Sequence, residues 1–181
     1  MIDKSKEVMK FWFEELTPKQ WFNSSDELDA KICDRFGMIH DAAAKGELES
    51  WRVTPEGSLA EIIVLDQFSR NIYRGKPGAF ANNLGALVLA QEAIRKGFHI
   101  KVETFKRSFF YMPFMHSESL KVHKKAVRLF NEPGTEDSFD YEIKHKNIIE
   151  RFGRFPHRNE ILGRKSTAEE IEFLTQPGSS F

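Results

Sequence analysis

Apolar residues recur every three or four positions along most of this chain, as they do in a helix with one buried face. The stripe of Phe11, Trp12 and Leu16 predicts a first helix over about residues 4–15. Seven further helices are predicted over about residues 25–46, 54–71, 84–97, 101–115, 117–130, 138–152 and 167–174. No segment alternates apolar and polar residues over the length of a strand, so the chain is predicted to be all-α.

Capping residues mark where several of these helices should begin. Ser25, Thr54 before Pro55, Ser117 and Thr167 each stand at a predicted start. Pro113 should kink or end its helix, and residues 75–78 (Gly-Lys-Pro-Gly) should form a turn. Because the connections are short, about eight helices are expected to pack as antiparallel helical hairpins.

Composition is typical of a single globular domain spanning residues 1–181, with 40% hydrophobic and 30% charged residues. Lys plus Arg and Asp plus Glu both total 27, so there is no net charge, which argues against a nucleic-acid partner.

Cys33 is the only cysteine, and we expect it in the core. No signal peptide or membrane-length apolar run is visible, so the protein is predicted to be cytoplasmic, with no membrane partner.

Some polar residues fall on the apolar faces of predicted helices. Asp66 and Arg70 continue the stripe of Ile62 and Ile63 by steps of three and four. A buried carboxylate must be paired or protonated. Two interpretations stay open: a structural Asp66–Arg70 pair, or a carboxylate that orients a side chain toward a ligand.

Histidines repeat this pattern on two later helices. His116 follows Phe109 and Met112, and His145 precedes Ile148 on the helix that leads into an arginine-rich segment. Either histidine alone is more typical of a hydrogen-bonded core residue than of a catalytic one. His123 lies on a lysine-rich helix and is expected to face solvent.

The arginine-rich segment covers residues 151–164. Glycine, proline and two phenylalanines interrupt it, which predicts a shaped loop rather than a solvated charge run. Its polar side chains are Arg154, His157, Arg158, Asn159 and Arg164. Because the guanidinium offers a fixed fork of donors, such a loop suits a carboxylate or phosphate.

No recognised metal, nucleotide or hydrolase motif is present. The chain lacks HExxH, paired cysteines, GxSxG, GxxxxGK[ST] and GxGxxG. We therefore predict no metal and no cofactor.

Several strings along the chain resemble one bacterial family, called domain of unknown function 924. The strings are Phe11-Trp12-Phe13, 65–75 (LDQFSRNIYRG), 113–118 (PFMHSE), 151–159 (RFGRFPHRN), 162–167 (LGRKST) and 177–181 (PGSSF). The resemblance implies an all-α, tetratricopeptide-like superhelix, although no 34-residue repeat signature is present. It implies no activity. Ser69 stands where the family usually has proline, so we expect a looser turn after Phe68.

Three functions stay open at this point: binding of a small anionic ligand or peptide, catalysis on a small anionic substrate, or a purely structural polar network. The candidate catalytic residues are Asp66, His116 and His157. The candidate ligand-binding residues are Arg70, Asn71, His145, Arg154, Arg158, Asn159 and Arg164. We expect Asp66, Arg70, His116, Arg154, His157 and Arg158 to converge in space. Two interpretations of the tail stay open: the carboxylate of Phe181 is held by Arg154, Arg158 or Arg164, or the tail is mobile.

Overall fold

The computed structural model describes residues 4–23 and 25–180, and every regular element in this part of the chain is helical. The predicted all-α class is confirmed. The longer helices are α3 (Asp26–Ala44), α4 (Pro55–Ile63), α7 (Asn83–Arg95), α8 (Thr104–Met115), α9 (Leu120–Phe130) and α10 (Glu136–Phe152). The shorter ones are α1 (Lys4–Lys10), α2 (Pro18–Phe22), α5 (Ser69–Ile72), α6 (Gly78–Ala81) and α11 (Ala168–Leu174). Tighter 3-10 turns are η2 (Glu49–Val53), η4 (His99–Lys101) and η5 (Pro156–Arg158), and wider π turns are η1 (Phe11–Glu15) and η3 (Val64–Phe68).

Three of the predicted capping residues are confirmed. The side chains of Ser25, Thr54 and Thr167 accept hydrogen bonds from backbone N–H groups in the first turns of α3, α4 and α11. The prediction for Ser117 is wrong, because α9 begins only at Leu120, with Ser119 in the cap position.

Two predicted interruptions can be located in the structure. Pro113 lies inside α8, which ends two residues later at Met115. The turn predicted at residues 75–78 is present, and Gly78 also begins α6. Gly78 allows a close approach there, since a Cβ would stand 2.7 Å from the Tyr73 ring.

Residues 55–72 form one continuous helical path through α4, η3 and α5. The looser turn expected at Ser69 is wrong, because the chain stays helical there. The Ser69 hydroxyl donates to the Leu65 carbonyl (2.6 Å) and accepts from Nε2 of His40 (2.8 Å). Asp66 lies in the π turn η3, a local widening that recurs at functional sites.

The core is divided between a large cluster and a small one. The large cluster is rich in aromatic contacts, such as those of Phe11 with Phe36 and Phe68. The small cluster consists of Ile148, Ile149 and Phe155. Cys33 belongs to neither, because its side chain is exposed, so the core position predicted for it is wrong.

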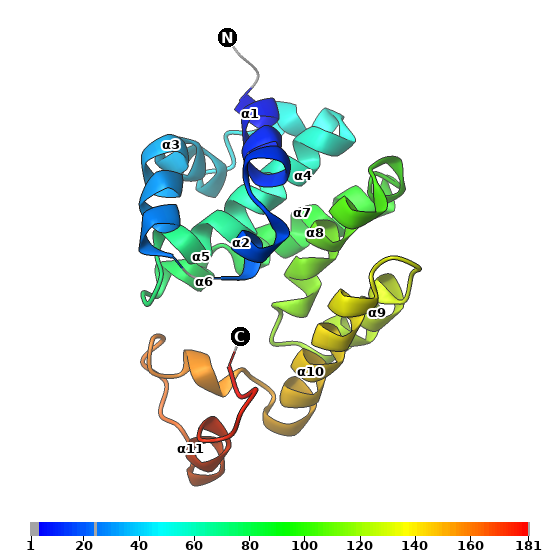
Figure 1. The fold of residues 1–181 in the computed structure, drawn as a ribbon. Helices are drawn as coiled ribbons and strands as arrows, with labels where there is room; N and C mark the ends of the chain where they lie inside the picture. The colour runs from blue at the N-terminus through cyan, green and yellow to red at the C-terminus, as the bar shows by residue number, and fades with distance from the viewer. Residues whose placement is uncertain (1–3, 24, 181) are drawn as a thin grey trace.

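Consecutive helices α7, α8, α9 and α10 each pack against the next, as predicted for helices joined by short connections. Figure 1 shows α1 to α8 as the main body of the molecule. The segment that follows α10 returns beneath α5 and α6, so residues near position 158 come to face residues near position 80. None of the described helices is both long and apolar enough to cross a membrane.

Candidate functional site

A buried carboxylate and an imidazole form the centre of the site. Asp66 in η3 is 1% exposed, and His116 stands at the C-terminal end of α8. His116 Nδ1 lies 2.8 Å from Oδ1 and 2.9 Å from Oδ2 of Asp66, and Gln67 Nε2 donates to Oδ2 at 2.7 Å. Nδ1 is therefore the protonated nitrogen, while Nε2 has no hydrogen-bond partner among the described residues.

The protonation of this pair follows from its surroundings. Burial, helped by the charge of Arg70, lowers the pKa of His116 to about 4, although Asp66 opposes the shift. Burial alone would raise the pKa of Asp66, but the proximity of His116 and Arg70 outweighs it and lowers that pKa below its usual value. At neutral pH the pair is a carboxylate and a neutral imidazole.

Arg70 is a secondary partner of Asp66. Its Nη2 lies 3.6 Å from Oδ1 of Asp66, which is longer than the bond from His116. Nη1 donates to the carbonyls of Asp66 (3.1 Å) and Ala79 (3.3 Å) and to Oδ1 of Asn83 (3.2 Å). Arg70 thus ties α5 to α6 and α7 as well as placing a positive charge beside Asp66.

Arg158 in η5 approaches the pair from the other side. Its Nη1 donates to the His116 carbonyl at 3.0 Å, and its guanidinium lies over the rings of Phe155 (4.3 Å) and Phe80 (4.7 Å). The residue is 5% exposed, and within the described part of the chain no carboxylate lies within 4.0 Å of it. Its Nε is buried without a hydrogen-bond partner there. Burial, helped by Arg70, lowers the pKa of Arg158 to about 9, so the group is still charged at neutral pH.

Arg164 has a structural partner. Its Nη1 and Nη2 donate to Glu118 at 2.6 and 2.9 Å, and Glu118 also accepts from the backbone N–H of Phe155 (2.8 Å). Burial raises the pKa of Glu118, but the hydrogen bonds from Arg164 and Phe155 outweigh it and lower that pKa. This ion pair fixes the arginine-rich segment against the α8–α9 turn.

Three other candidates are held outside this group. Arg154 was expected to converge with Asp66, but its guanidinium is bound by both carboxylate oxygens of Glu170 (2.6 and 2.7 Å) and by the Lys165 carbonyl. Asn159 donates to Ser166, and Asn71 donates to Asp29 on α3.

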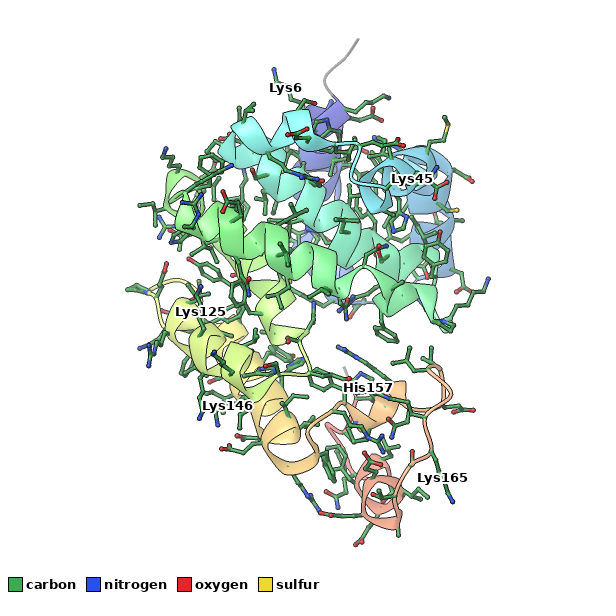
Figure 2. The ribbon with its side chains drawn as sticks, turned by 180° about the vertical axis from the view of Figure 1, so that it is seen from behind. Lys6, Lys45, Lys125, Lys146, His157 and Lys165 are labelled. Carbon is green, nitrogen blue, oxygen red and sulfur yellow. The ribbon has the colours of Figure 1, made fainter. Side chains whose placement is uncertain are left out.

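The two other candidate histidines, His145 and His157, lie beside Phe155 of the small core cluster. The His145 ring lies 6.3 Å from that of His116, and its Nδ1 donates to the Tyr141 carbonyl. The His157 ring lies 5.6 Å from Phe155, on the segment that follows α10 (Figure 2). Burial lowers the pKa of His145 to about 3 and that of His157 to about 4. Burial lowers the pKa of five histidines in all: His40, His99, His116, His145 and His157.

The prediction that His123 faces solvent is wrong. Its side chain is fully buried, with Nδ1 2.8 Å from Oε1 of Glu142, and Nε2 donates to the Ser117 carbonyl at 2.8 Å. The spacing of His123, Ala126 and Phe130 along α9 carries the signal for this burial, since these three residues share one buried face.

A cleft of about 480 Å³ opens beside the Asp66–His116 pair. One wall comes from α6, α7 and their connections: Pro77, Phe80, Ala81, Asn83, Leu84 and Leu87. We call the part lined by His116, Ser117 and Glu118 the floor and the part lined by Arg158 and Leu162 the opposite wall, where Arg158 itself lies against Phe80. Phe80 and Leu84 could not be found from the sequence, because apolar residues of a binding wall look like ordinary core residues.

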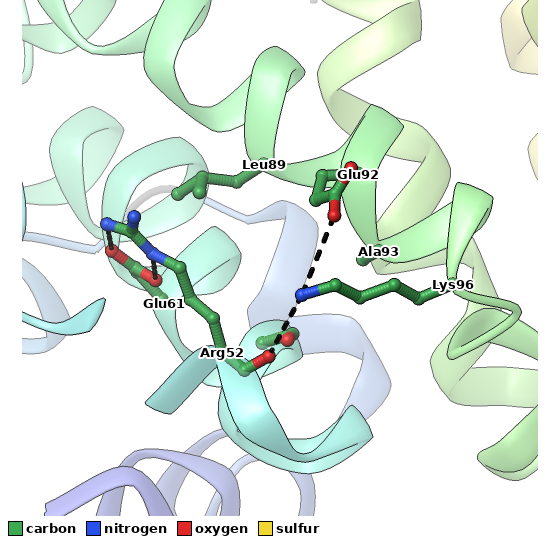
Figure 3. Close-up of a pocket in the computed structure, with 7 residues that line it drawn as sticks. Arg52, Glu61, Leu89, Glu92, Ala93 and Lys96 are labelled. Carbon is green, nitrogen blue, oxygen red and sulfur yellow. Dashed lines mark hydrogen bonds and ion pairs between the residues drawn. The ribbon is translucent and has the colours of Figure 1, made fainter. Parts of the chain in front are cut away.

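A second hollow, shown in Figure 3, has room for about one water molecule, with a volume of about 10 Å³. Its charged groups already satisfy one another. Arg52 binds both carboxylate oxygens of the fully buried Glu61 at 2.7 Å, and Lys96 lies between Glu92 and the Arg52 carbonyl. This hollow is a packing feature rather than a candidate site.

Among the residues that the structure describes, no three His, Cys, Asp or Glu side chains are grouped in a way that could hold a metal ion. Close to the C-terminus, Ser179 is buried, with its hydroxyl donating to the Leu174 carbonyl. Phe181, whose carboxylate was expected to bind an arginine, lies outside the described residues.

Comparisons with known proteins agree with this fold. The structure resembles the solved structure of a protein of unknown function from Agrobacterium tumefaciens, with a TM-score of 0.90 and 40% sequence identity over 94% of this chain and 96% of that one. No curated protein matches the chain. A tetratricopeptide-like superhelix stays a prediction. The model of the family described as "Bacterial protein of unknown function (DUF924)" matches residues 8–178, so the chain belongs to this family.

Proposed function

We propose that the cleft binds a small organic anion, with Arg158 as its main anchor. The observation that carries this proposal is a buried guanidinium with no carboxylate within 4.0 Å among the described residues. An uncompensated buried charge is costly, and breaking a buried ion pair by removing one partner costs about 3–5 kcal/mol. A bound anion would supply the missing charge at the cleft wall that Arg158 forms.

The other charges near Arg158 are largely committed to partners. Glu118 is bound by Arg164, and Asp66 is bound by His116 with Arg70 nearby. Three arginines (Arg70, Arg158 and Arg164) and two carboxylates (Asp66 and Glu118) therefore lie in this part of the molecule, which leaves one excess positive charge. The size of the cleft falls within the range of about 300–1,000 Å³ typical of small-molecule sites. Both features favour a small ligand over a peptide.

A thermal-shift screen with single anions tests this function. Acetate, hexanoate, benzoate and phosphate are each added to the wild-type protein, to Arg158→Gln and to a control, Arg128→Gln, which removes an exposed arginine from α9. A ligand at 100 times its Kd stabilises by about 2.7 kcal/mol, which raises the Tm of a chain this size by about 5–10 °C.

We expect at least one anion to raise the Tm of the wild type and of Arg128→Gln, but not that of Arg158→Gln. Arg158→Met, which also removes the charge and has a flexible apolar side chain suited to a position between two phenylalanine rings, provides a second variant should Arg158→Gln fail to fold. An equal response in wild type and in a folded Arg158 variant without charge would place the anion elsewhere.

Catalysis is a second candidate function, favoured by the geometry of His116. Asp66 fixes Nδ1 as the protonated nitrogen, so the lone pair of Nε2 is available to accept a proton from a water or hydroxyl in the cleft. In this hypothesis Asp66 orients His116, which is the base, and Arg158 holds the anion. His157 lies near these residues without taking part in the proton transfer. Hydrolysis of carboxylic esters that is lost in His116→Gln while anion binding is kept would support it.

A cytoplasmic location belongs to the same proposal and stays a prediction.

A further inference from the structure

The walls of the cleft differ in chemistry from its floor. The wall contributed by α6 and α7 presents mainly apolar side chains, among them Phe80, Leu84 and Leu87. Leu162 adds a further apolar side chain from the opposite wall. The polar groups gather at the floor and beside it, at His116 and Arg158. A ligand that fits both regions is charged at one end and apolar along the rest.

We propose that the ligand is an organic monoanion with an aliphatic chain, such as a medium-chain carboxylate, and this inference rests on the proposed function. The carboxylate would lie against Arg158, and the chain would extend along Leu84 and Leu162.

The charge of the head group follows from the arginines and carboxylates near Arg158. One excess positive charge is matched by a carboxylate, whereas a phosphate monoester would add a second negative charge close to Asp66 and Glu118. Glu118 and Asp66 lie near enough to Arg158 to raise its pKa, although burial and the charge of Arg70 outweigh them and lower it.

Two exposed leucines and the volume of the cleft favour a ligand with an apolar chain. Leu84 is 72% exposed and Leu162 is 37% exposed, although both line the cleft. A chain packed between them would remove this apolar surface from water. The cleft volume of about 480 Å³ is far more than the few non-hydrogen atoms of acetate or phosphate would fill.

A homologous series of carboxylates tests the proposal. Acetate, butyrate, hexanoate and octanoate are titrated into the wild-type protein by calorimetry, together with hexanamide, which has the chain without the charge. Each added CH₂ that becomes buried should lower Kd by about fourfold. Hexanamide should bind much more weakly than hexanoate.

Two matched variants on α7 test where the aliphatic chain of the ligand lies. Leu84→Ser removes an apolar side chain that lines the cleft, and Val88→Ser removes one from the next turn, 52% exposed and outside the cleft lining. Because both positions are exposed, neither change should unfold the protein. We expect the dependence of Kd on chain length to flatten in Leu84→Ser and to stay unchanged in Val88→Ser.

The outcomes separate this inference from the function on which it rests. Equal affinity for acetate and octanoate, with loss of binding in Arg158→Gln, would refute the proposal that the ligand has an aliphatic chain, while the proposal of an anion site at Arg158 would stand. Equal binding of hexanamide and hexanoate would overturn the charged head group. No binding of any carboxylate or of phosphate would overturn both proposals.

Discussion

Removing the carboxylate of Asp66 should destabilise the fold strongly. Asp66→Ala leaves the Nδ1–H of His116 and one N–H of Gln67 without an acceptor, and it leaves Arg70 without its nearest carboxylate. An unsatisfied buried donor costs about 1–3 kcal/mol, and breaking a buried pair costs about 3–5 kcal/mol. We therefore expect the free energy of unfolding to fall by about 3–5 kcal/mol. For a chain of this length the Tm should fall by about 6–20 °C.

Urea unfolding followed by circular dichroism measures this loss. Asp66→Asn keeps an acceptor oxygen for His116 and should lose less than Asp66→Ala. Asp34→Ala removes an exposed carboxylate from α3 and should stay within about 0.5 kcal/mol of the wild type. If Asp66→Ala also changed stability by less than about 0.5 kcal/mol, the buried Asp66–His116 pair would not hold the fold together.

Three further predictions concern other charged and titratable groups. Arg154→Ala should lower the free energy of unfolding, because Glu170 is almost fully buried and loses its bidentate partner, while anion binding in thermal-shift assays should be kept. Lost anion binding would instead place Arg154 at the site. Glu142→Ala should cost about 3–5 kcal/mol in urea unfolding, since it breaks the buried contact with His123, and a cost below about 0.5 kcal/mol would show that this contact contributes little. Stability should also fall as the pH drops from about 6.5 toward 4, because the unfolded chain binds protons at histidines that stay neutral when folded. Each of the five histidines can contribute up to about 1.4 kcal/mol per pH unit, so urea midpoints should be level from pH 8 to 7 and fall by pH 5. A level midpoint down to pH 5 would contradict the lowered histidine pKa values.

The helices could be predicted from the sequence wherever a local signal was sufficient. Ser25, Thr54 and Thr167 accept hydrogen bonds from backbone groups three residues later, so each cap is determined within one turn. The start of α9 could not be found in this way. Ser117 and Ser119 are equally good capping residues, and a contact across six positions, from His123 to the Ser117 carbonyl, accompanies the later start.

The site could be predicted only in part, because its contacts also depend on residues far apart in the chain. Helical periodicity showed that Asp66 and His116 point inward, but their contact joins residues 50 positions apart and depends on how η3 and α8 pack. Arg154 and Arg158 are four residues apart in one irregular segment, yet one binds Glu170 and the other stacks on Phe80 and Phe155. In such a segment side-chain direction follows from the backbone, which composition does not determine.

The most direct test of the central claim is an NMR titration of the arginine side chains with hexanoate. Arg158, Arg154 and Arg164 are assigned through single-site variants, and their guanidinium ¹⁵N resonances are followed as hexanoate is added. We predict a saturable shift of the Arg158 resonance, with the Arg154 resonance unchanged because Glu170 already occupies its donors. A shift confined to Arg154, or no saturable shift at Arg158, would contradict the assignment of the cleft as a carboxylate site anchored by Arg158.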